Sequence, residues 1–142
     1  MLSQLRRVVQ RRSFASHRRA GPEPEIEALL AVARQSFVRL QAAWDAADLQ
    51  ALASFTTEPL LEDLRVQLAE RGPMPNRTEV LQLEARLLGI EELREARIAR
   101  VEFSGLIRER AGAHAAPFRE LWMLAKLADA HAWQLAQVQS LS

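Results

Sequence analysis

The 142-residue chain has room for one domain, and a domain of this size buries about two-thirds of the surface that its unfolded form exposes. Apolar residues make up 49% and charged residues 26%, as in globular proteins, and no apolar run reaches the roughly 18 to 20 residues that span a bilayer. The absence of cysteine excludes disulfides, thiol catalysis and zinc-thiolate sites.

The net charge of +1 is unevenly divided along the chain. Residues 1–22 hold six arginines and no acid, whereas residues 23–142 hold the other 13 basic residues and all 18 acidic ones. The leader therefore carries +6 and the body −5 (13 less 18). A negative body argues against electrostatic wrapping of nucleic acid.

The leader has the pattern of a short basic amphipathic helix. On a helical wheel one arc holds the apolar side chains and the opposite arc and its flanks hold arginines: Leu2, Leu5, Val8 and Val9 against Arg6, Arg7, Arg11 and Arg12. Such a helix suits an anionic membrane surface, and an acid-free, Arg- and Ser-rich start is also typical of mitochondrial transit peptides. A targeting peptide, a membrane-contacting arm and a disordered leader without a role all stay open.

The residues Gly21-Pro22-Glu23-Pro24 break any helix and mark the end of the leader. We therefore expect a leader and linker over residues 1–24 and one domain over residues 25–142.

The first half of this domain predicts three helices. Apolar residues recur at three- and four-residue steps from Glu25 to about Ala47, which indicates one long helix. Asp48 is placed to cap a short second helix, and Thr57 to cap a third. That third helix has Pro59 near its first turn and ends at Gly72-Pro73.

The second half predicts four antiparallel strands. Leucine and alanine alternate with polar residues after Thr78 until Gly89 interrupts the pattern, although the local propensity favours helix. The next strand, over residues 96–107, changes its apolar parity, so we expect a β-bulge near Ala99 or Arg100. Two tryptophan-bearing strands, 118–124 and 133–138, close the chain as a hairpin. Helices followed by strands predict an α+β fold with the helices on one face of a curved sheet.

The first hairpin strand is apolar on both sides at its centre. Alternation divides it into two sets, Phe118, Glu120, Trp122 and Leu124 on one face and Leu121, Met123, Ala125 and Leu127 on the other. One face can pack against the helices. The other face must line a pocket or meet a partner, because large exposed apolar patches are rare on monomers.

From Phe37 to Val138 the sequence resembles the Tim forty-four-like family, named for a peripheral subunit of the mitochondrial inner-membrane translocase and also found in bacteria. The resemblance rests on the order and spacing of five features: Phe37 and Trp44 followed by Asp48-Leu49, a helix at Thr57, Val101-Glu102-Phe103-Ser104-Gly105, Phe118-x-Glu120-x-Trp122, and Trp133-x-Leu135.

This resemblance implies a cone-shaped α+β fold similar to nuclear transport factor two, with a concave sheet and a hydrophobic pocket. It also implies contact with anionic inner-membrane lipid or with membrane-bound translocation, insertion or ribosomal machinery, and no enzyme. Import subunits of the family carry a long N-terminal region that recruits the chaperone motor, and this sequence has no counterpart to it. We therefore expect a membrane-proximal binding module rather than a motor tether.

Two groups of residues are the candidates for function. The pocket or partner-binding group is Phe103, Phe118, Glu120, Trp122, Leu124, Trp133 and Leu135, and the membrane-contact or targeting group is Leu2, Leu5, Arg6, Arg7, Val9, Arg11 and Arg12. Glu120 is open to three interpretations: a structural acid, kept neutral or paired with an arginine, a ligand contact, or a catalytic acid. The two tryptophans are core residues or pocket lining.

The alternative function is a small-molecule or acid–base pocket protein that uses Glu120. An enzyme of that kind needs a donor facing the acid, but the chain has no tyrosine, and His114 and His131 fall in a predicted loop and turn. Metal-site and phosphate-loop motifs are absent from the sequence as well. We therefore expect no enzyme, no cofactor and no nucleic acid.

The expected location is the periphery of an inner membrane, bacterial, or mitochondrial on the matrix side if the leader is a transit peptide. A homodimer through the sheet face is a further expectation.

Overall fold

The computed structural model describes residues 18–19, 23–72, 77–109 and 112–141. Its helices and strands follow the predicted order, with one short strand added at the start: β1 (Arg18–Arg19), α1 (Glu23–Asp45), α2 (Leu49–Ala53), α3 (Glu58–Arg71), β2 (Glu79–Glu92), β3 (Ala96–Arg108), β4 (Ala116–Leu127) and β5 (Gln134–Ser140).

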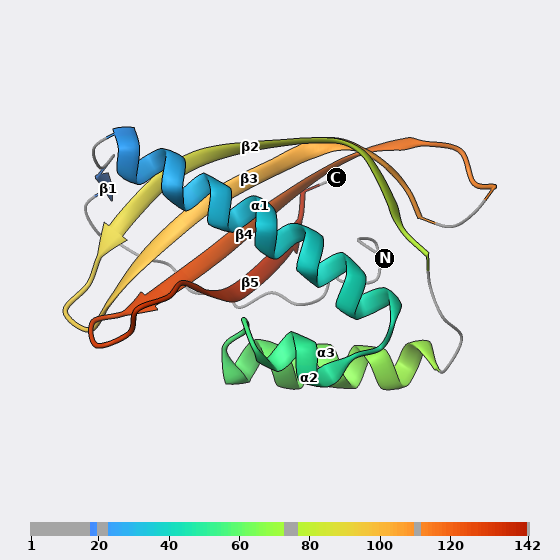
Figure 1. Cartoon of the computed structure of the whole chain (residues 1–142), viewed down its shortest axis with the longest axis horizontal. Coiled ribbons are helices and arrows are strands. Elements are labelled where there is room, and N and C mark those ends of the chain that lie inside the picture. Colours follow the sequence, from blue (N-terminus) through green and yellow to red (C-terminus); the bar gives the residue numbers. More distant parts are fainter. Residues whose placement is uncertain (1–17, 20–22, 73–76, 110–111, 142) are drawn as a thin grey trace.

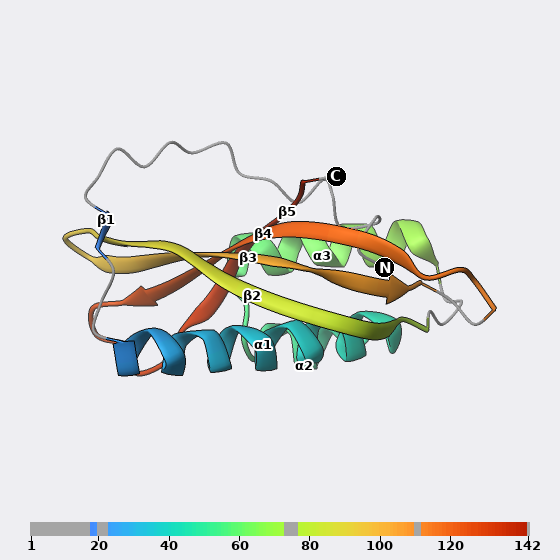
Figure 2. The same ribbon diagram turned by 90° about the horizontal axis from the view of Figure 1, so that it is seen from above.

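The strands form one twisted antiparallel sheet in the order β1-β2-β3-β4-β5. The long helix α1 crosses one face of this sheet, and α2 and α3 lie beyond its β5 edge (Figures 1 and 2). The segment between α2 and α3 pairs with β5, since Thr57 N donates to Leu135 O (2.9 Å) and Leu135 N donates to Phe55 O (2.8 Å). This arrangement confirms the predicted α+β fold with helices packed against a curved antiparallel sheet.

Local signals place the helix ends close to where the sequence predicts them. The backbone N of Ala51 donates to Asp48 Oδ1 (3.0 Å), so Asp48 caps α2 as expected. Thr57 precedes α3, but its side chain makes no capping hydrogen bond. At the other end of α3, Gly72 has φ 85°, the left-handed conformation that glycine adopts most easily.

The β-bulge that the sequence predicts in β3 is found in the neighbouring strand, β2, instead. Strand β3 pairs with β4 without a register shift, so the bulge expected near Ala99 or Arg100 is wrong. The β2–β3 pairing has two register shifts, and the one opposite Arg100 falls in β2 between Leu87 and Gly89, which pair with Val101 and Arg100. Gly89 does not end the strand, because β2 continues to Glu92.

The core lies between α1 and the sheet and is centred on Phe37. The Phe37 ring lies 4.8 Å from that of Phe103, 5.7 Å from that of Phe118 and 5.3 Å from that of Trp122, measured between centroids. Phe103 and Trp122 meet edge to face at 4.9 Å. All four side chains are buried, and such pairs contribute about 0.5–1.5 kcal/mol each beyond the burial of their area.

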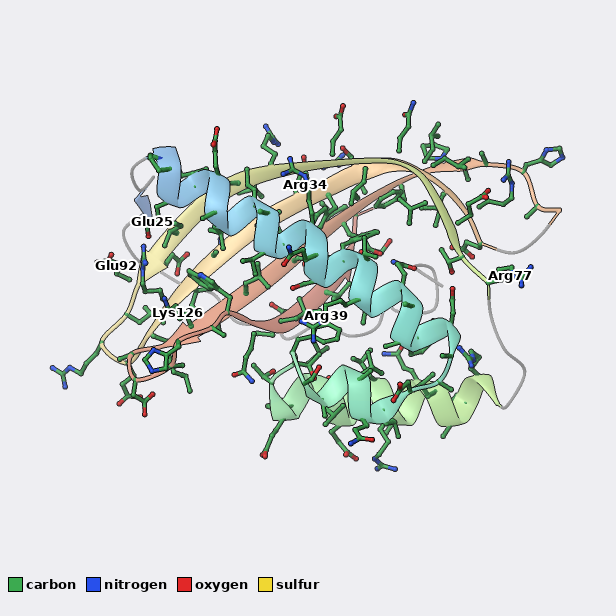
Figure 3. The ribbon with its side chains drawn as sticks, viewed as in Figure 1. Glu25, Arg34, Arg39, Arg77, Glu92 and Lys126 are labelled. Carbon is green, nitrogen blue, oxygen red and sulfur yellow. The ribbon has the colours of Figure 1, made fainter. Side chains whose placement is uncertain are left out.

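Polar contacts fix both ends of α1 to the sheet. At its start, Arg97 of β3 pairs with Glu25 (2.5 Å) and with Glu92 (3.8 Å), and Figure 3 shows Glu25 and Glu92 at the same end of the molecule. At its end, Asp45 accepts hydrogen bonds from the backbone N (2.7 Å) and the hydroxyl (3.1 Å) of Thr78. The helix is therefore held in one position across the strands.

Candidate functional site: a pocket on the outer face of the sheet

The sheet has an inner face, which α1 covers, and an outer face, which carries Ile98, Arg100, Met123, Ala125 and Leu127 and turns away from α1. The register places these side chains together, because Ile98 pairs with Ala125 and Arg100 pairs with Met123. The prediction that the hairpin strand is apolar on both faces is therefore confirmed: Trp122 and Leu124 point to the inner face, and Met123, Ala125 and Leu127 to the outer one.

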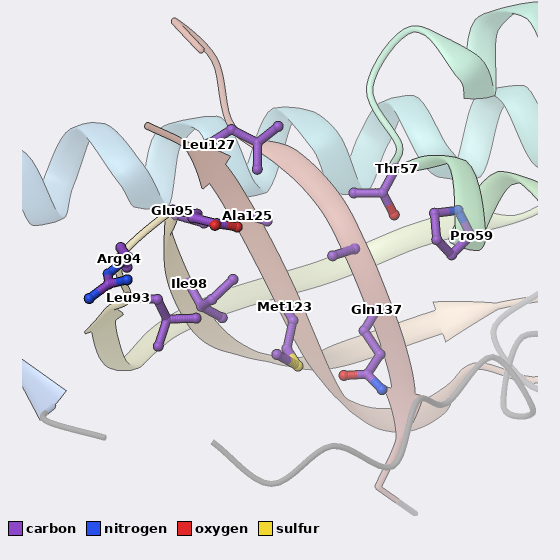
Figure 4. Close-up of a pocket in the computed structure, with 12 residues that line it drawn as sticks. Thr57, Pro59, Leu93, Arg94, Glu95, Ile98, Met123, Ala125, Leu127 and Gln137 are labelled. Atoms are coloured by element: carbon purple, nitrogen blue, oxygen red, sulfur yellow. The ribbon is translucent and has the colours of Figure 1, made fainter. Parts of the chain in front are cut away.

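A cavity of about 720 Å³ opens on the outer face, between the β2–β3 turn and the start of α3 (Figure 4). Its walls are mainly apolar and come from strands β3, β4 and β5 and from the β2–β3 turn: Leu93, Ala96, Ile98, Met123, Ala125, Leu127 and Ala136, with Thr57, Pro59, Arg94, Glu95 and Gln137 completing the lining. We call it the outer pocket. Its size lies within the roughly 300–1,000 Å³ of small-molecule sites.

Two exposed leucines stand at the mouth of the outer pocket. Leu93 is 41% exposed and Leu127 is 49% exposed. Leu93 lies in the β2–β3 turn, and Leu127 is the last residue of β4. Both side chains are available to a ligand that enters the pocket, and full burial of such a side chain stabilises a complex by about 1.5–3 kcal/mol.

Beside the outer pocket, the outer face carries charged side chains that pair with one another. Glu102 accepts hydrogen bonds from Arg86 (3.0 Å) and Arg119 (3.2 Å), and Arg100 pairs with Glu91 at 3.1 Å. Glu91 is only 2% exposed, so the Arg100–Glu91 pair sits in a largely desolvated position. The outer face therefore has an ion-paired region next to the apolar region that the outer pocket occupies.

The predicted pocket residues lie mainly in the core between α1 and the sheet. Six of the seven are buried there, and Trp133 is half-buried beside Arg97, whose guanidinium carbon lies 5.8 Å from the ring centroid. None of the seven lines the outer pocket. Their contact with a ligand or partner stays a prediction.

Glu120 is a buried acid whose hydrogen-bond partner is an aromatic side chain, not an arginine. Trp122 Nε1 donates to Glu120 Oε1 (2.8 Å), and Glu120 Oε2 has no hydrogen-bond partner within the described part of the chain. Burial raises the pKa of the Glu120 carboxyl to about 8 from an ordinary 4.5, and the Trp122 hydrogen bond opposes that rise only in part. The carboxyl is therefore mainly protonated at neutral pH, which favours the neutral-acid interpretation over the ion pair.

Sequence reasoning missed most of the outer pocket, although one signal for it was present. The apolar residues Ala96 and Ile98 stand at even positions, whereas Val101 and Phe103 stand at odd positions. The predicted bulge was the explanation for this change. Strand β3 is regular, so Ile98 instead faces outward and is an apolar residue on the outer face. The contributions of Thr57, Pro59 and Ala136 depend on tertiary contacts that no local pattern shows.

The leader candidates Leu2, Leu5, Arg6, Arg7, Val9, Arg11 and Arg12 lie outside the described residues. Across the described ranges, no cluster of His, Asp and Glu is arranged to hold a metal ion. His114 and His131 are exposed. None of the helices described here is both long enough and apolar enough to cross a membrane.

The model of the Tim44-like domain family matches residues 10–140. The chain belongs to this family. The match confirms the resemblance found in the sequence, and the Tim44-like domain covers the described fold from α1 to β5.

Among solved structures, the Tim44-like chain is similar to the crystal structure of a ketosteroid isomerase-like protein from Erwinia carotovora atroseptica, at 17% identity and a TM-score of 0.41. The alignment covers 80% of this chain and 96% of that one. A similarity at this level carries no conclusion about activity. None of the curated proteins compared with the chain matches it.

Proposed function

We propose that the protein is a non-enzymatic, membrane-proximal binding module of the Tim44-like family. In this proposal it lies at the periphery of an inner membrane and uses the outer pocket to hold the apolar part of a ligand. That ligand is an acyl chain of anionic membrane lipid or an apolar side chain of a membrane-bound translocation partner. The observation that carries the proposal is the apolar pocket of about 720 Å³ on the sheet face that α1 leaves uncovered.

The chemistry of the outer pocket supports binding without reaction. Its apolar walls offer surface for burial, while Glu95, Arg94 and Gln137 are the main polar side chains among its lining residues. No histidine or tyrosine lines it. A site of this kind favours a ligand through burial of apolar area, at about 25 cal/mol per Å² removed from water, and offers little for acid–base chemistry.

The position of Glu120 gives no support to the acid–base alternative. A general acid must reach its substrate within hydrogen-bond distance, and Glu120 lies 1% exposed in the core on the face opposite the outer pocket. Its hydrogen bond goes to Trp122, which packs against Phe37. We therefore assign Glu120 a structural role in the inner core.

Co-sedimentation with lipid vesicles tests the proposed function. The full chain is mixed with vesicles that contain cardiolipin and, separately, with vesicles of phosphatidylcholine alone, each at low and high salt. We expect binding to the cardiolipin vesicles that weakens with salt, because the leader arginines are screened, but retains a component that depends on the outer pocket.

Two matched substitutions separate the outer pocket from general surface effects. Leu127→Glu places a charge at the pocket mouth, and Val38→Glu places the same charge on α1, where Val38 is 58% exposed away from the pocket. We expect Leu127→Glu to lower vesicle affinity about tenfold, the equivalent of losing one buried leucine, and Val38→Glu to change it little. Equal effects of the two substitutions would contradict a role for the outer pocket.

A further inference from the structure

Strand β2 has a free edge along most of its length. Its one neighbour on that side within the described residues is β1, which pairs only with Ile90 and Glu91. In Figure 1, β2 forms one border of the sheet, and α1 crosses away from it toward α2 and α3. The N–H and C=O groups on a free edge form a template for another strand, and the pairing with β1 shows that this edge accepts an antiparallel one.

The middle of this edge is self-complementary in sequence. Residues 83–87 are Leu-Glu-Ala-Arg-Leu, symmetric about Ala85 except that an acid on one side matches a base on the other. This segment lies between the two register shifts of β2 and pairs with β3 in regular order. In an antiparallel pair of two copies centred on Ala85, Glu84 of each copy therefore stands directly opposite Arg86 of the other, and the leucines of the segment also face each other.

The charges at these positions are not balanced within one copy. Glu102 of β3 accepts hydrogen bonds from both Arg86 (3.0 Å) and Arg119 (3.2 Å), so this trio carries one surplus positive charge. Glu84 is exposed and has no ion pair among the described residues. In the pair of copies, Glu84 of one supplies the missing acid beside Arg86 of the other. Opposite charges directly across two antiparallel strands attract, and like charges there repel.

A groove of about 510 Å³ lies along the same stretch of the edge. Its lining comes from residues 83–86 of β2, from Glu102 and Ser104 on the outer face of β3, and from Arg34 of α1. Figure 3 shows Arg34 on the β2 side of α1. Because the walls come from both sides of the sheet, the groove lies at the edge itself, where a second strand has to enter.

We propose that two copies of the chain form a two-fold dimer by antiparallel pairing of residues 83–87, with Glu84 of each copy against Arg86 of the other. The two sheets join into one, and the two-fold axis is perpendicular to it, so both α1 helices lie on one side and both outer pockets on the other. None of residues 83–87 lines the outer pocket. This contact differs from the sheet-face dimer that the sequence led us to expect, and it does not depend on the proposed function.

Analytical ultracentrifugation of the full chain from about 1 to 200 μM tests the pairing. A small interface gives a weak and reversible dimer, so we expect monomer at the low end of this range and dimer at the high end. Glu84→Arg alone or Arg86→Glu alone sets like charges opposite each other twice, and each should weaken the dimer at least tenfold. Glu70→Arg, at an exposed position of α3, is the matched control and should leave the dimer unchanged.

Two rescue measurements separate ion pairing from a general loss of folding. An equimolar mixture of the Glu84→Arg chain and the Arg86→Glu chain sets arginine opposite glutamate at both positions, so it should dimerise at least tenfold more tightly than either variant alone. The double variant, Glu84→Arg with Arg86→Glu, should dimerise by itself. Monomer at every concentration of the unaltered chain, or loss of the dimer without recovery in either rescue, would overturn the proposal. A dimer that neither single variant weakens would assign the contact to another surface.

Discussion

Replacement of Glu120 by glutamine should remove a large pH dependence of stability. In the folded chain, burial raises the pKa of Glu120 to about 8, whereas the unfolded chain exposes an ordinary carboxyl of pKa 4.5. Between these values the native state binds a proton that the unfolded state has released. The free energy of unfolding therefore falls as pH rises, by up to about 1.4 kcal/mol per pH unit.

The contribution of Glu120 is greatest below pH 4.5 and is lost as pH rises through about 8. From the two pKa values, the loss reaches about 3 kcal/mol at pH 7 and approaches about 5 kcal/mol above pH 8. Glu120→Gln keeps the size of the side chain and an oxygen that accepts from Trp122 Nε1, but it has no proton to lose. Its stability should therefore change little over this range.

Urea unfolding followed by tryptophan fluorescence at pH 5, 6, 7 and 8 measures this difference. Glu84→Gln, at an exposed position of β2, is the matched control and should keep the slope of the native chain. A native chain whose unfolding free energy is constant or rises from pH 5 to pH 8, or a Glu120→Gln chain with the native slope, would refute a buried neutral carboxyl.

Four other substitutions test the fold by urea unfolding. Gly105→Ala should lower the free energy of unfolding by more than about 3 kcal/mol or prevent folding, because φ is 155° and the new Cβ would lie 1.9 Å from the carbonyl oxygen of Gln82. Gly72→Ala is the matched control. Its φ is 85° and its new Cβ meets open space, so it should lower the free energy of unfolding by only about 1–2 kcal/mol. Phe37→Ala should cost about 3–5 kcal/mol by emptying the centre of the aromatic cluster, and a cost below 1 kcal/mol would contradict that packing. Asp48→Ala should cost about 1 kcal/mol through loss of the α2 cap, and no change would exclude a stabilising cap.

The helices and the strand order could be predicted because their signals are local. The three-and-four-residue repeat, the capping Asp48 and the terminal Gly72 each act within one turn of helix, and the structure confirms each of them. The alternation of residues in the hairpin strand likewise predicted which side chains share a face of the sheet. The position of the bulge could not be predicted, because it depends on the registers on both sides of β3, and the extra residue belongs to β2.

The candidate site was predicted only in outline, as an apolar outer face that needs a cover. Met123, Ala125 and Leu127 followed from alternation, but Thr57, Pro59 and Ala136 come from segments that only the fold brings beside β4. The hydrogen-bond partner of Glu120 also could not be predicted from the sequence. Whether a buried carboxylate meets arginine or becomes neutral depends on which side chains surround it, and here Trp122 two residues along the strand supplies the only hydrogen bond that the described residues give it.

The vesicle-binding comparison of Leu127→Glu with Val38→Glu tests the central claim most directly. Both substitutions replace an exposed apolar side chain by the same charge, so they differ chiefly in whether the outer pocket is altered. A binding module that uses this pocket predicts about tenfold weaker cardiolipin binding for Leu127→Glu and near-native binding for Val38→Glu. Native affinity in the Leu127→Glu chain, or no cardiolipin binding by the unaltered chain at low salt, would contradict the account.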